Sequence, residues 1–293
     1  MCGIAGIIST DSLGKEKLNR SIEVMNQLQI HRGPDGQQIW INPNNNVGFG
    51  HVRLSIIGLT SGDQPMTDLY GNTICFNGEI YNYKDLKEEL KYDYSFKTNS
   101  DTEVILAAYL KWGNDCVNHL RGMFSFAIYN GKTDQVFCAR DRFGIKPFYY
   151  YQNNGVFYFA SEVKALIPFL DEIETNETAL NEYLFFQMGL GYETLFKDIK
   201  QLSPAHTLTI SNGELAFKKY WEVYYNLDFD HTQKYFDEKL QELLYDSIKY
   251  HTVSDVPIGA YVSGGIDSGV IASVANKEKS VEDELMAFTG KFS

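Results

Sequence analysis

The feature that most restricts the fold is a series of short apolar and aromatic runs, each closed by turn-forming residues, in the first two-thirds of the chain. Runs of this length and spacing are typical of β-strands. Asn153-Asn154-Gly155 between two of them is a hairpin signal. Many closely spaced strands favour antiparallel sheets. The expected strands are Cys2–Ile8, Val47–Ser55, Thr73–Phe76, Met123–Tyr129, Gln135–Arg140, Phe148–Gln152 and Val156–Ala160.

Two helices are expected among these strands. Apolar residues recur at helical spacing over Lys15–Gln29, which predicts an amphipathic helix. Ser100 followed by Glu103 is a capping-box pattern, so a second helix should begin there. Together with the strands, this predicts an α+β fold with helices packed on the outer faces of antiparallel sheets.

The pattern changes after about residue 215. A long helix is expected at Thr232–His251, then a strand at Val256–Val262, a helix at Gly269–Ala275 and a strand at Leu285–Thr289. Strand, glycine-rich turn, helix and strand in this order open a parallel α/β sheet. One such unit cannot cover both faces of a parallel sheet, so we expect this second domain to be incomplete. The expected domains are residues 1–215 and 216–293.

Composition excludes several classes of function. The chain has 38 acidic and 26 basic residues, a net charge of −12, which argues against nucleic-acid binding through a broad basic surface. No apolar run approaches the ~18 residues needed to span a bilayer, and the N-terminus lacks the basic region of a secretory signal. The four cysteines contain no CxxC pair, which disfavours a zinc site or a disulfide framework. A cytoplasmic protein is expected.

Cys2 lies directly behind the initiator Met1 and is followed by Gly3. A cysteine in this place has two readings. It can be a small buried residue at the start of a strand. Alternatively, removal of Met1 would make Cys2 an N-terminal nucleophile whose own α-amine, with a pKa near ~7.7–8.0, acts as general base. Gly3 would leave room for a substrate beside the sulfur.

Other residues have the groups needed to bind an amino-acid substrate and to stabilise a reaction at its side-chain amide. Asn77 and Gly78 offer a side-chain amide and a backbone N–H that can form an oxyanion hole, although Asn-Gly is also a common turn. Arg32 and Arg53 are candidate cations for a carboxylate. Asp101 is a candidate carboxylate for an ammonium, although Asp at a helix start is also ordinary capping.

The loop Ser263-Gly264-Gly265-Ile266-Asp267-Ser268 lies between a predicted strand and a predicted helix. Successive backbone N–H groups and the helix N-terminus can bind a phosphate there. The loop lacks the GK[ST] of a Walker A motif, and a plain turn is the alternative reading.

Nine stretches of sequence favour a functional over a merely structural interpretation of these residues. They are MCGIAGI, HRGPDG, HVRLSI, FNGEIYNY, SDTEVIL, LRGMFSFAIY, ARDRFGIKPFYY, FASEVKAL and SGGIDS. In content and order they resemble the class II, N-terminal-nucleophile glutamine amidotransferases, and among these the glutamine-hydrolysing asparagine synthases. The resemblance implies a layered αββα glutaminase domain with antiparallel sheets. It also implies that the start of an α/β ATP-pyrophosphatase domain follows.

The resemblance also implies residue roles. Cys2 would attack the glutamine amide, with Asn77 and Gly78 binding the oxyanion. Arg53 would bind the glutamine carboxylate, and Glu79 and Asp101 would lie near its ammonium. The backbone of Leu54, Ser55 and Ile56 would line the same pocket.

In the second domain, the resemblance implies that Val262 contacts the adenosine of ATP. Ser263, Gly264, Gly265 and Ser268 would bind pyrophosphate, and Asp267 would lie near Mg²⁺. The products would be pyrophosphate and an acyl-AMP, which ammonia converts to an amide. Aspartate is the expected acceptor. The open alternatives are a different carboxylate acceptor and a non-catalytic binding module, and a homodimer is also left open.

Overall fold

The computed structural model describes residues 2–278 and 285–290. The chain forms two compact units, Met1–Glu222 and Val223–Ser293. The boundary that the sequence suggested near residue 215 falls within strand β12 (Glu214–Lys219), and the units divide after that strand. No helix in the described ranges is long and apolar enough to cross a membrane.

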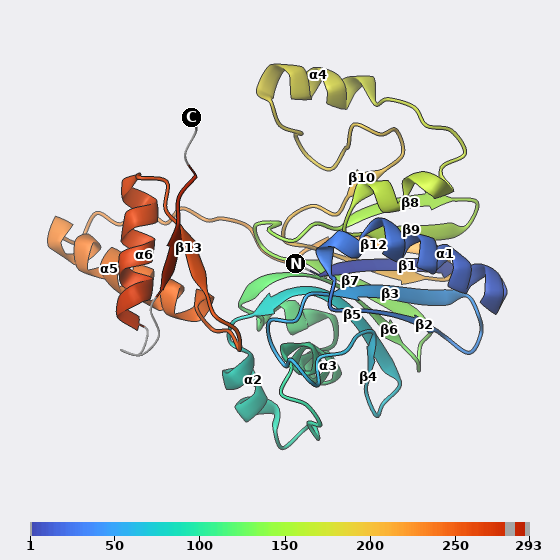
Figure 1. Cartoon of the computed structure of the whole chain (residues 1–293), viewed down its shortest axis with the longest axis horizontal. Helices are drawn as coiled ribbons and strands as arrows, with labels where there is room; N and C mark the ends of the chain where they lie inside the picture. The colour runs from blue at the N-terminus through green and yellow to red at the C-terminus, as the bar shows by residue number, and fades with distance from the viewer. Residues whose placement is uncertain (1, 279–284, 291–293) are drawn as a thin grey trace. The chain divides into compact units, whose positions relative to one another are not determined.

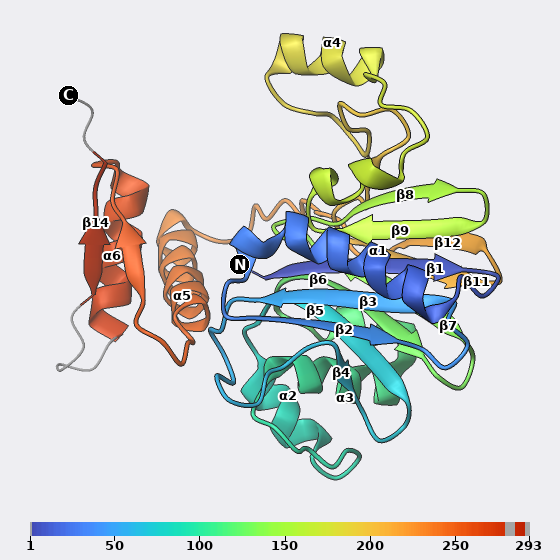
Figure 2. The same ribbon diagram turned by 45° about the vertical axis from the view of Figure 1, so that its right-hand side comes forward.

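The first unit contains two six-stranded antiparallel sheets stacked face to face (Figure 1 and Figure 2). The strand order of one sheet is β10 (Lys200–Gln201), β8 (Tyr149–Asn153), β9 (Val156–Ala160), β1 (Gly3–Ser9), β3 (Val47–Arg53) and β2 (Gly36–Ile41). The order of the other is β12, β11 (His206–Ser211), β7 (Gln135–Arg140), β6 (Gly122–Asn130), β5 (Asn72–Ile80) and β4 (Met66–Thr67).

Helices cover both outer faces of this sandwich (Figure 2). Helix α1 (Lys15–Leu28) buries its apolar face on the first sheet, and α3 (Asp101–Trp112) packs on β5 of the second, with α2 (Tyr83–Leu90) beside it. The arrangement is the layered αββα fold expected from the sequence. The remaining helices are α4 (Glu177–Phe186) and the short η1 (Ile30–Arg32), η2 (Gly113–Asn118), η3 (Val163–Ala165) and η4 (Ile167–Phe169).

Alternate residues of the central strands fill the space between the sheets. Ile4 of β1, Phe49 of β3 and Cys75 of β5 belong to one buried cluster. Because side chains along a strand alternate between its faces, Cys2 and Asn77 share the inward parity of Ile4 and Cys75. The candidate nucleophile and the candidate oxyanion donor therefore lie at one end of the inter-sheet layer.

The capping box expected at Ser100 and Glu103 forms only in part. Ser100 Oγ caps α3 by accepting from Thr102 N–H at 3.2 Å. The Glu103 carboxylate does not return to Ser100 N–H but accepts from Lys97 N–H at 2.9 Å and from Thr98 N–H at 2.7 Å. The carboxylate bonds to the preceding loop because the backbone N–H groups of that loop need acceptors.

The second unit contains α5 (Gln233–His251), β13 (Gly259–Tyr261), α6 (Ile266–Glu278) and β14 (Met286–Phe288). The two strands are parallel, as expected. Ile248, Val274 and Ala275 form a small core between the helices. Strand β13 is shorter than the predicted Val256–Val262, and α6 begins directly after the glycine-rich turn rather than at Gly269.

Candidate active site

A pocket opens at the end of the inter-sheet layer, and every residue lining it belongs to the first unit. It is built from the starts and ends of strands β1, β3 and β5 and from the first turn of α3. Seven of the eight residues expected to contact glutamine line it together with Cys2: Arg53, Leu54, Ile56, Asn77, Gly78, Glu79 and Asp101.

Ser55 is the expected pocket residue that does not line the pocket. Its backbone N–H donates to Asp35 Oδ2 at 2.8 Å, which directs this part of the chain towards the neighbouring loop. Asp35 belongs to the HRGPDG stretch, so the two sequence motifs are joined at this point.

The Cys2 side chain is held by the backbone of Leu54. The Leu54 N–H donates to Sγ at 3.3 Å, and Sγ lies 3.5 Å from the Leu54 carbonyl oxygen. Burial raises the pKa of the Cys2 thiol, and the Leu54 N–H opposes this rise. A thiol with a raised pKa holds its proton at rest, so reaction at this sulfur needs a base close to it. Met1, whose removal an N-terminal nucleophile requires, lies outside the described residues.

Asn77 contributes a donor that has no acceptor. The residue is 1% exposed, and its Nδ2 atom is buried without a hydrogen-bond partner in the part of the chain that the structure describes. A buried donor without a partner is costly and uncommon in native proteins. This donor lines the same pocket as Cys2.

The backbone N–H of Gly78 faces the same pocket, as strand pairing shows. Gly78 lies opposite Phe124 of β6, but both polar backbone groups of Phe124 bond Asp141, at 2.8 and 3.2 Å. Gly78 therefore points its own N–H away from β6, towards the free edge of β5. On that edge the N–H groups of Phe76 and Ile80 are taken by Gln64 Oε1 and Asp101 Oδ2.

The Gly78 N–H therefore lies on the same edge of β5, between the donors of Phe76 and Ile80. The glycine also has a steric reason to be there, because a Cβ at this position would lie 2.1 Å from the Met123 carbonyl oxygen. The Asn77 amide and the Gly78 N–H are adjacent donors, as an oxyanion hole requires.

Charges of both signs line the pocket. Arg53 donates from Nη1 to Asp63 at 2.8 Å and from Nη2 to the Gly58 carbonyl at 2.7 Å, which ties it to the loop that follows β3. Asp101 is buried, and burial raises its pKa to about 7; the Ile80 N–H opposes that rise, whereas the charge of Glu79 adds to it. Two carboxylates with a guanidinium suit a zwitterionic amino acid.

Lys146 and Gln64 also line the pocket, although sequence reasoning did not single them out. Lys146 is buried, and burial lowers the pKa of its ammonium, an effect that the charge of Glu79 opposes. Its loop is held by Asp141, whose carboxylate accepts from the N–H of Ile145 and of Lys146 at 2.9 Å each. The only sequence signal for Lys146 was its place in ARDRFGIKPFYY.

In the second unit the glycine-rich loop turns tightly between β13 and α6. Gly264 has a φ of +85°, and a Cβ there would meet nothing within 4 Å. The hydroxyl groups of Ser263 and Ser268 lie 3.1 Å apart across the loop, and Asp267 lies in the first turn of α6. No group of three metal-binding side chains occurs in the described ranges.

Comparison with known proteins matches the two units to two families. The model of the glutamine amidotransferase domain family matches residues 1–221, and that of the asparagine synthase family matches residues 239–293. Glutamine phosphoribosylpyrophosphate amidotransferase from Bacillus subtilis has a similar fold, with a TM-score of 0.54 and 14% identity over 99% of this chain and 66% of that one.

Two curated relatives come from Bacillus subtilis strain 168. Asparagine synthetase [glutamine-hydrolyzing] 1 is 41% identical over 94% of this chain and 44% of its own length. Asparagine synthetase [glutamine-hydrolyzing] 3 is 38% identical over 94% of this chain and 45% of its own length. The chain thus spans about half the length of these relatives. With a family model matched over three-quarters of its residues and the fold to go with it, the chain belongs to the glutamine amidotransferase domain family.

Proposed function

We propose that the chain hydrolyses glutamine at Cys2 and that the ammonia released converts aspartate to asparagine. The observation that carries the first part is the unpartnered donor Asn77 Nδ2, which lies next to Gly78 in the pocket that Cys2 lines. An oxyanion would accept from Asn77 Nδ2 and from the Gly78 N–H, so the otherwise unfavourable burial of the Asn77 amide becomes useful in the transition state.

The reaction begins with the proton of the Cys2 thiol. After removal of Met1, the α-amine of Cys2 takes this proton, and Sγ forms a bond to the amide carbon of glutamine. The negative charge on the carbonyl oxygen is stabilised by Asn77 and Gly78. The C–N bond then breaks, the α-ammonium returns the proton to the leaving group, and ammonia departs. Water hydrolyses the thioester to glutamate and restores the thiol.

The charged residues of the pocket would orient the substrate. Arg53 would bind the α-carboxylate, and Asp101 and Glu79 would bind the α-ammonium. Leu54 and Ile56 would contact the carbon chain of the substrate. Ser55 would contact the substrate through its backbone carbonyl, because its N–H donates to Asp35.

The second part of the proposal concerns the acceptor. Val262, Ser263, Gly264, Gly265 and Ser268 would hold ATP, and Asp267 would lie towards Mg²⁺. ATP would supply activation of the acceptor carboxylate, with release of pyrophosphate. The match of residues 239–293 to the asparagine synthase family favours aspartate over another carboxylate. The intact set of Cys2, Asn77 and Asp101 in one pocket argues against a non-catalytic module.

Three further expectations complete the proposal. The protein would act in the cytoplasm and would bind neither nucleic acid nor membrane. Whether it forms a homodimer is tested by its mass in solution. None of these bears on the chemistry at Cys2.

The test is release of ammonia from glutamine by purified protein whose N-terminus has been sequenced. Cys2→Ala should abolish this release, whereas Cys75→Ala, a change at a buried cysteine between the sheets, should leave it near the original rate. Equal rates for the two variants would reject Cys2 as the nucleophile. Supplying ATP, Mg²⁺ and aspartate then tests the acceptor, because asparagine should accumulate.

A further inference from the structure

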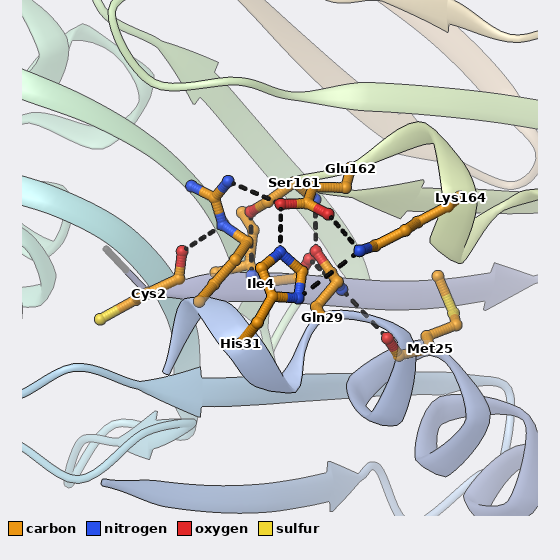
Figure 3. A network of polar contacts seen from close by, with 9 residues as sticks. Cys2, Ile4, Met25, Gln29, His31, Ser161, Glu162 and Lys164 are labelled. Atoms are coloured by element: carbon orange, nitrogen blue, oxygen red, sulfur yellow. Dashed lines mark hydrogen bonds and ion pairs between the residues drawn. The ribbon is translucent and has the colours of Figure 1, made fainter. Parts of the chain in front are cut away.

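The main chain of Cys2 is held by a network of charged side chains at the start of β1 (Figure 3). Arg32 Nε–H donates to the Cys2 carbonyl oxygen at 2.9 Å, and Arg32 Nη1–H donates to Glu162 Oε1 at 3.0 Å. Arg32 is the last residue of η1, and Glu162 follows β9 in the FASEVKAL stretch. The contacts therefore join three segments that are distant in sequence.

A residue at the beginning of a chain needs such contacts more than others do. Once Met1 is removed, Cys2 has a covalent neighbour on one side only, and chain ends fray unless other groups hold them. The contact between Sγ and Leu54 changes when the sulfur reacts. The hydrogen bond to the carbonyl does not involve the reacting atom, so it can hold the backbone of Cys2 throughout the reaction.

Glu162 is the group that keeps Arg32 in this position. The Arg32 side chain is 11% exposed, and its Nη2 is buried without a partner in the described part of the chain. Glu162 is the only carboxylate paired with Arg32 among the described residues. Without that carboxylate, a buried guanidinium would carry an uncompensated charge, which favours its turning to solvent and away from Cys2.

Glu162 also binds two residues that do not touch Cys2. Its Oε1 lies 2.9 Å from His31 Nε2, and its Oε2 lies 3.2 Å from Lys164 Nζ; both partners are about half exposed. Burial acts to raise the pKa of Glu162, but hydrogen bonds from Arg32, His31 and Lys164 outweigh burial and lower it. Lys164 therefore provides a matched control, because it contacts the same carboxylate on the side remote from the nucleophile.

A separate, uncharged network holds the next part of β1. Ile4 N–H donates to Ser161 Oγ at 3.0 Å, Ser161 N–H donates to Gln29 Oε1 at 3.1 Å, and Gln29 Nε2 donates to the Ile4 carbonyl at 3.3 Å (Figure 3). None of these bonds involves the Glu162 side chain. A change at Glu162 should therefore loosen Cys2 without unfolding the strand.

We propose that Glu162 is a positioning residue for the nucleophile, acting through Arg32 on the carbonyl of Cys2. The inference deepens the proposed function, since it concerns the same reaction at the same sulfur. Glu162 does not touch the reacting atoms, so its effect should be on the chemical step rather than on glutamine binding.

The experiment compares Glu162→Ala, Glu162→Gln and Lys164→Met. Displacement of a nucleophile typically lowers the rate by about ten- to a hundredfold, which we expect for kcat of Glu162→Ala with KM within about twofold. Glu162→Gln should lose less, because its amide oxygen still accepts a hydrogen bond but without charge assistance. Lys164→Met should keep kcat. Equal kcat values for Glu162→Ala and Lys164→Met, or a change confined to KM, would overturn the inference.

Hydrogen–deuterium exchange gives a readout that does not depend on glutaminase activity. In the N-terminal peptide, exchange should rise in Glu162→Ala only before Ile4, at the start of β1, whereas a peptide from β6 should be unchanged and Lys164→Met should match the unmodified protein. Unchanged exchange in Glu162→Ala would overturn the positioning role. If the unmodified protein released no ammonia, the proposed function would fail, and the exchange result would still decide whether Glu162 holds Cys2.

Discussion

The imidazole of His51 donates a hydrogen bond from Nε2–H to the carbonyl oxygen of Phe76, with 3.1 Å between the two atoms. His51 belongs to β3 and Phe76 to β5, so the bond crosses from one sheet to the other. It lies beside the pocket, because Arg53 follows His51 on β3 and Asn77 follows Phe76 on β5. The spacing between the cation and the oxyanion donor is thus set partly by one neutral histidine.

The burial of His51 predicts a pH dependence of the free energy of unfolding. Burial lowers the pKa of His51 to about 4, although the bond to Phe76 opposes this, so the native state binds fewer protons than the unfolded state between about pH 4 and 6.5. The contribution of His51 is fully present above about pH 6.5 and is lost as the pH falls towards 4, by about 3 kcal/mol in all. Urea unfolding at several pH values measures this loss.

Replacement by glutamine is the control for this prediction. His51→Gln keeps a donor for the Phe76 carbonyl but does not titrate, so its stability should change less over the same pH range. The difference between the two proteins is the quantity to compare, because Asp101, with its raised pKa, acts in the opposite direction. If the two pH profiles were parallel, His51 would not be the titrating group.

The elements that sequence patterns predicted best are those with a strong local signal. The Asn153-Asn154-Gly155 hairpin forms between β8 and β9, with positive φ at Asn154 and Gly155, because these residue types accept that backbone conformation. Helix α1 follows its apolar stripe closely. Strand β2, in contrast, has the sequence GQQIWI, and its polar first half gives no clear alternation.

Site residues were predictable from the sequence where a motif contains the residue types that the chemistry requires. They were less predictable where contacts between distant parts of the chain place a side chain in the pocket. Cys2, Asn77 and Asp101 meet in one pocket. Gln64 enters that pocket because its amide oxygen caps Phe76 N–H and its Nε2 donates to Thr102 Oγ1 at 3.2 Å, and neither contact follows from sequence spacing. The same holds for Lys146, whose place depends on contacts of Asp141.

A second prediction separates catalysis from folding at Asn77. Its amide nitrogen has no partner in the described structure, so truncation removes a buried unsatisfied donor. Asn77→Ala should therefore lower kcat by ~10²–10³ with little change in KM, and should leave the melting temperature unchanged or raised. Steady-state glutaminase kinetics and thermal unfolding measure the two effects. A large loss of stability would show that the amide has a structural partner instead.

Arg53 should give the opposite kinetic pattern. A carboxylate clamp acts equally in the ground state and the transition state, so Arg53→Ala should chiefly raise KM for glutamine. Because Arg53 also holds the loop through Gly58 and Asp63, Asp63→Asn serves as the control for the loop contact alone. The proposed role fails if Arg53→Ala lowers kcat and leaves KM unchanged.

The last prediction concerns the pH dependence of glutamine binding. Burial raises the pKa of Asp101 to about 7, and the neighbouring charge of Glu79 contributes to that rise against the opposing Ile80 N–H. If Asp101 binds the α-ammonium of glutamine, it must do so as a carboxylate. KM should therefore rise as the pH falls below 7, approaching tenfold per pH unit, and should level off above it. At saturating glutamine, kcat should not follow this titration.

Replacing the carboxyl group tests the assignment directly. Asp101→Asn cannot ionise, so its KM should be high and flat between about pH 5.5 and 8, a range that includes the raised pKa of the original carboxyl group. Since Asp101 Oδ2 also accepts from Ile80 N–H, the asparagine can retain that bond through its amide oxygen and keep the edge of β5 in place. A KM that rises below pH 7 in both proteins would assign the titration to another group, such as Glu79, and would remove Asp101 from substrate binding.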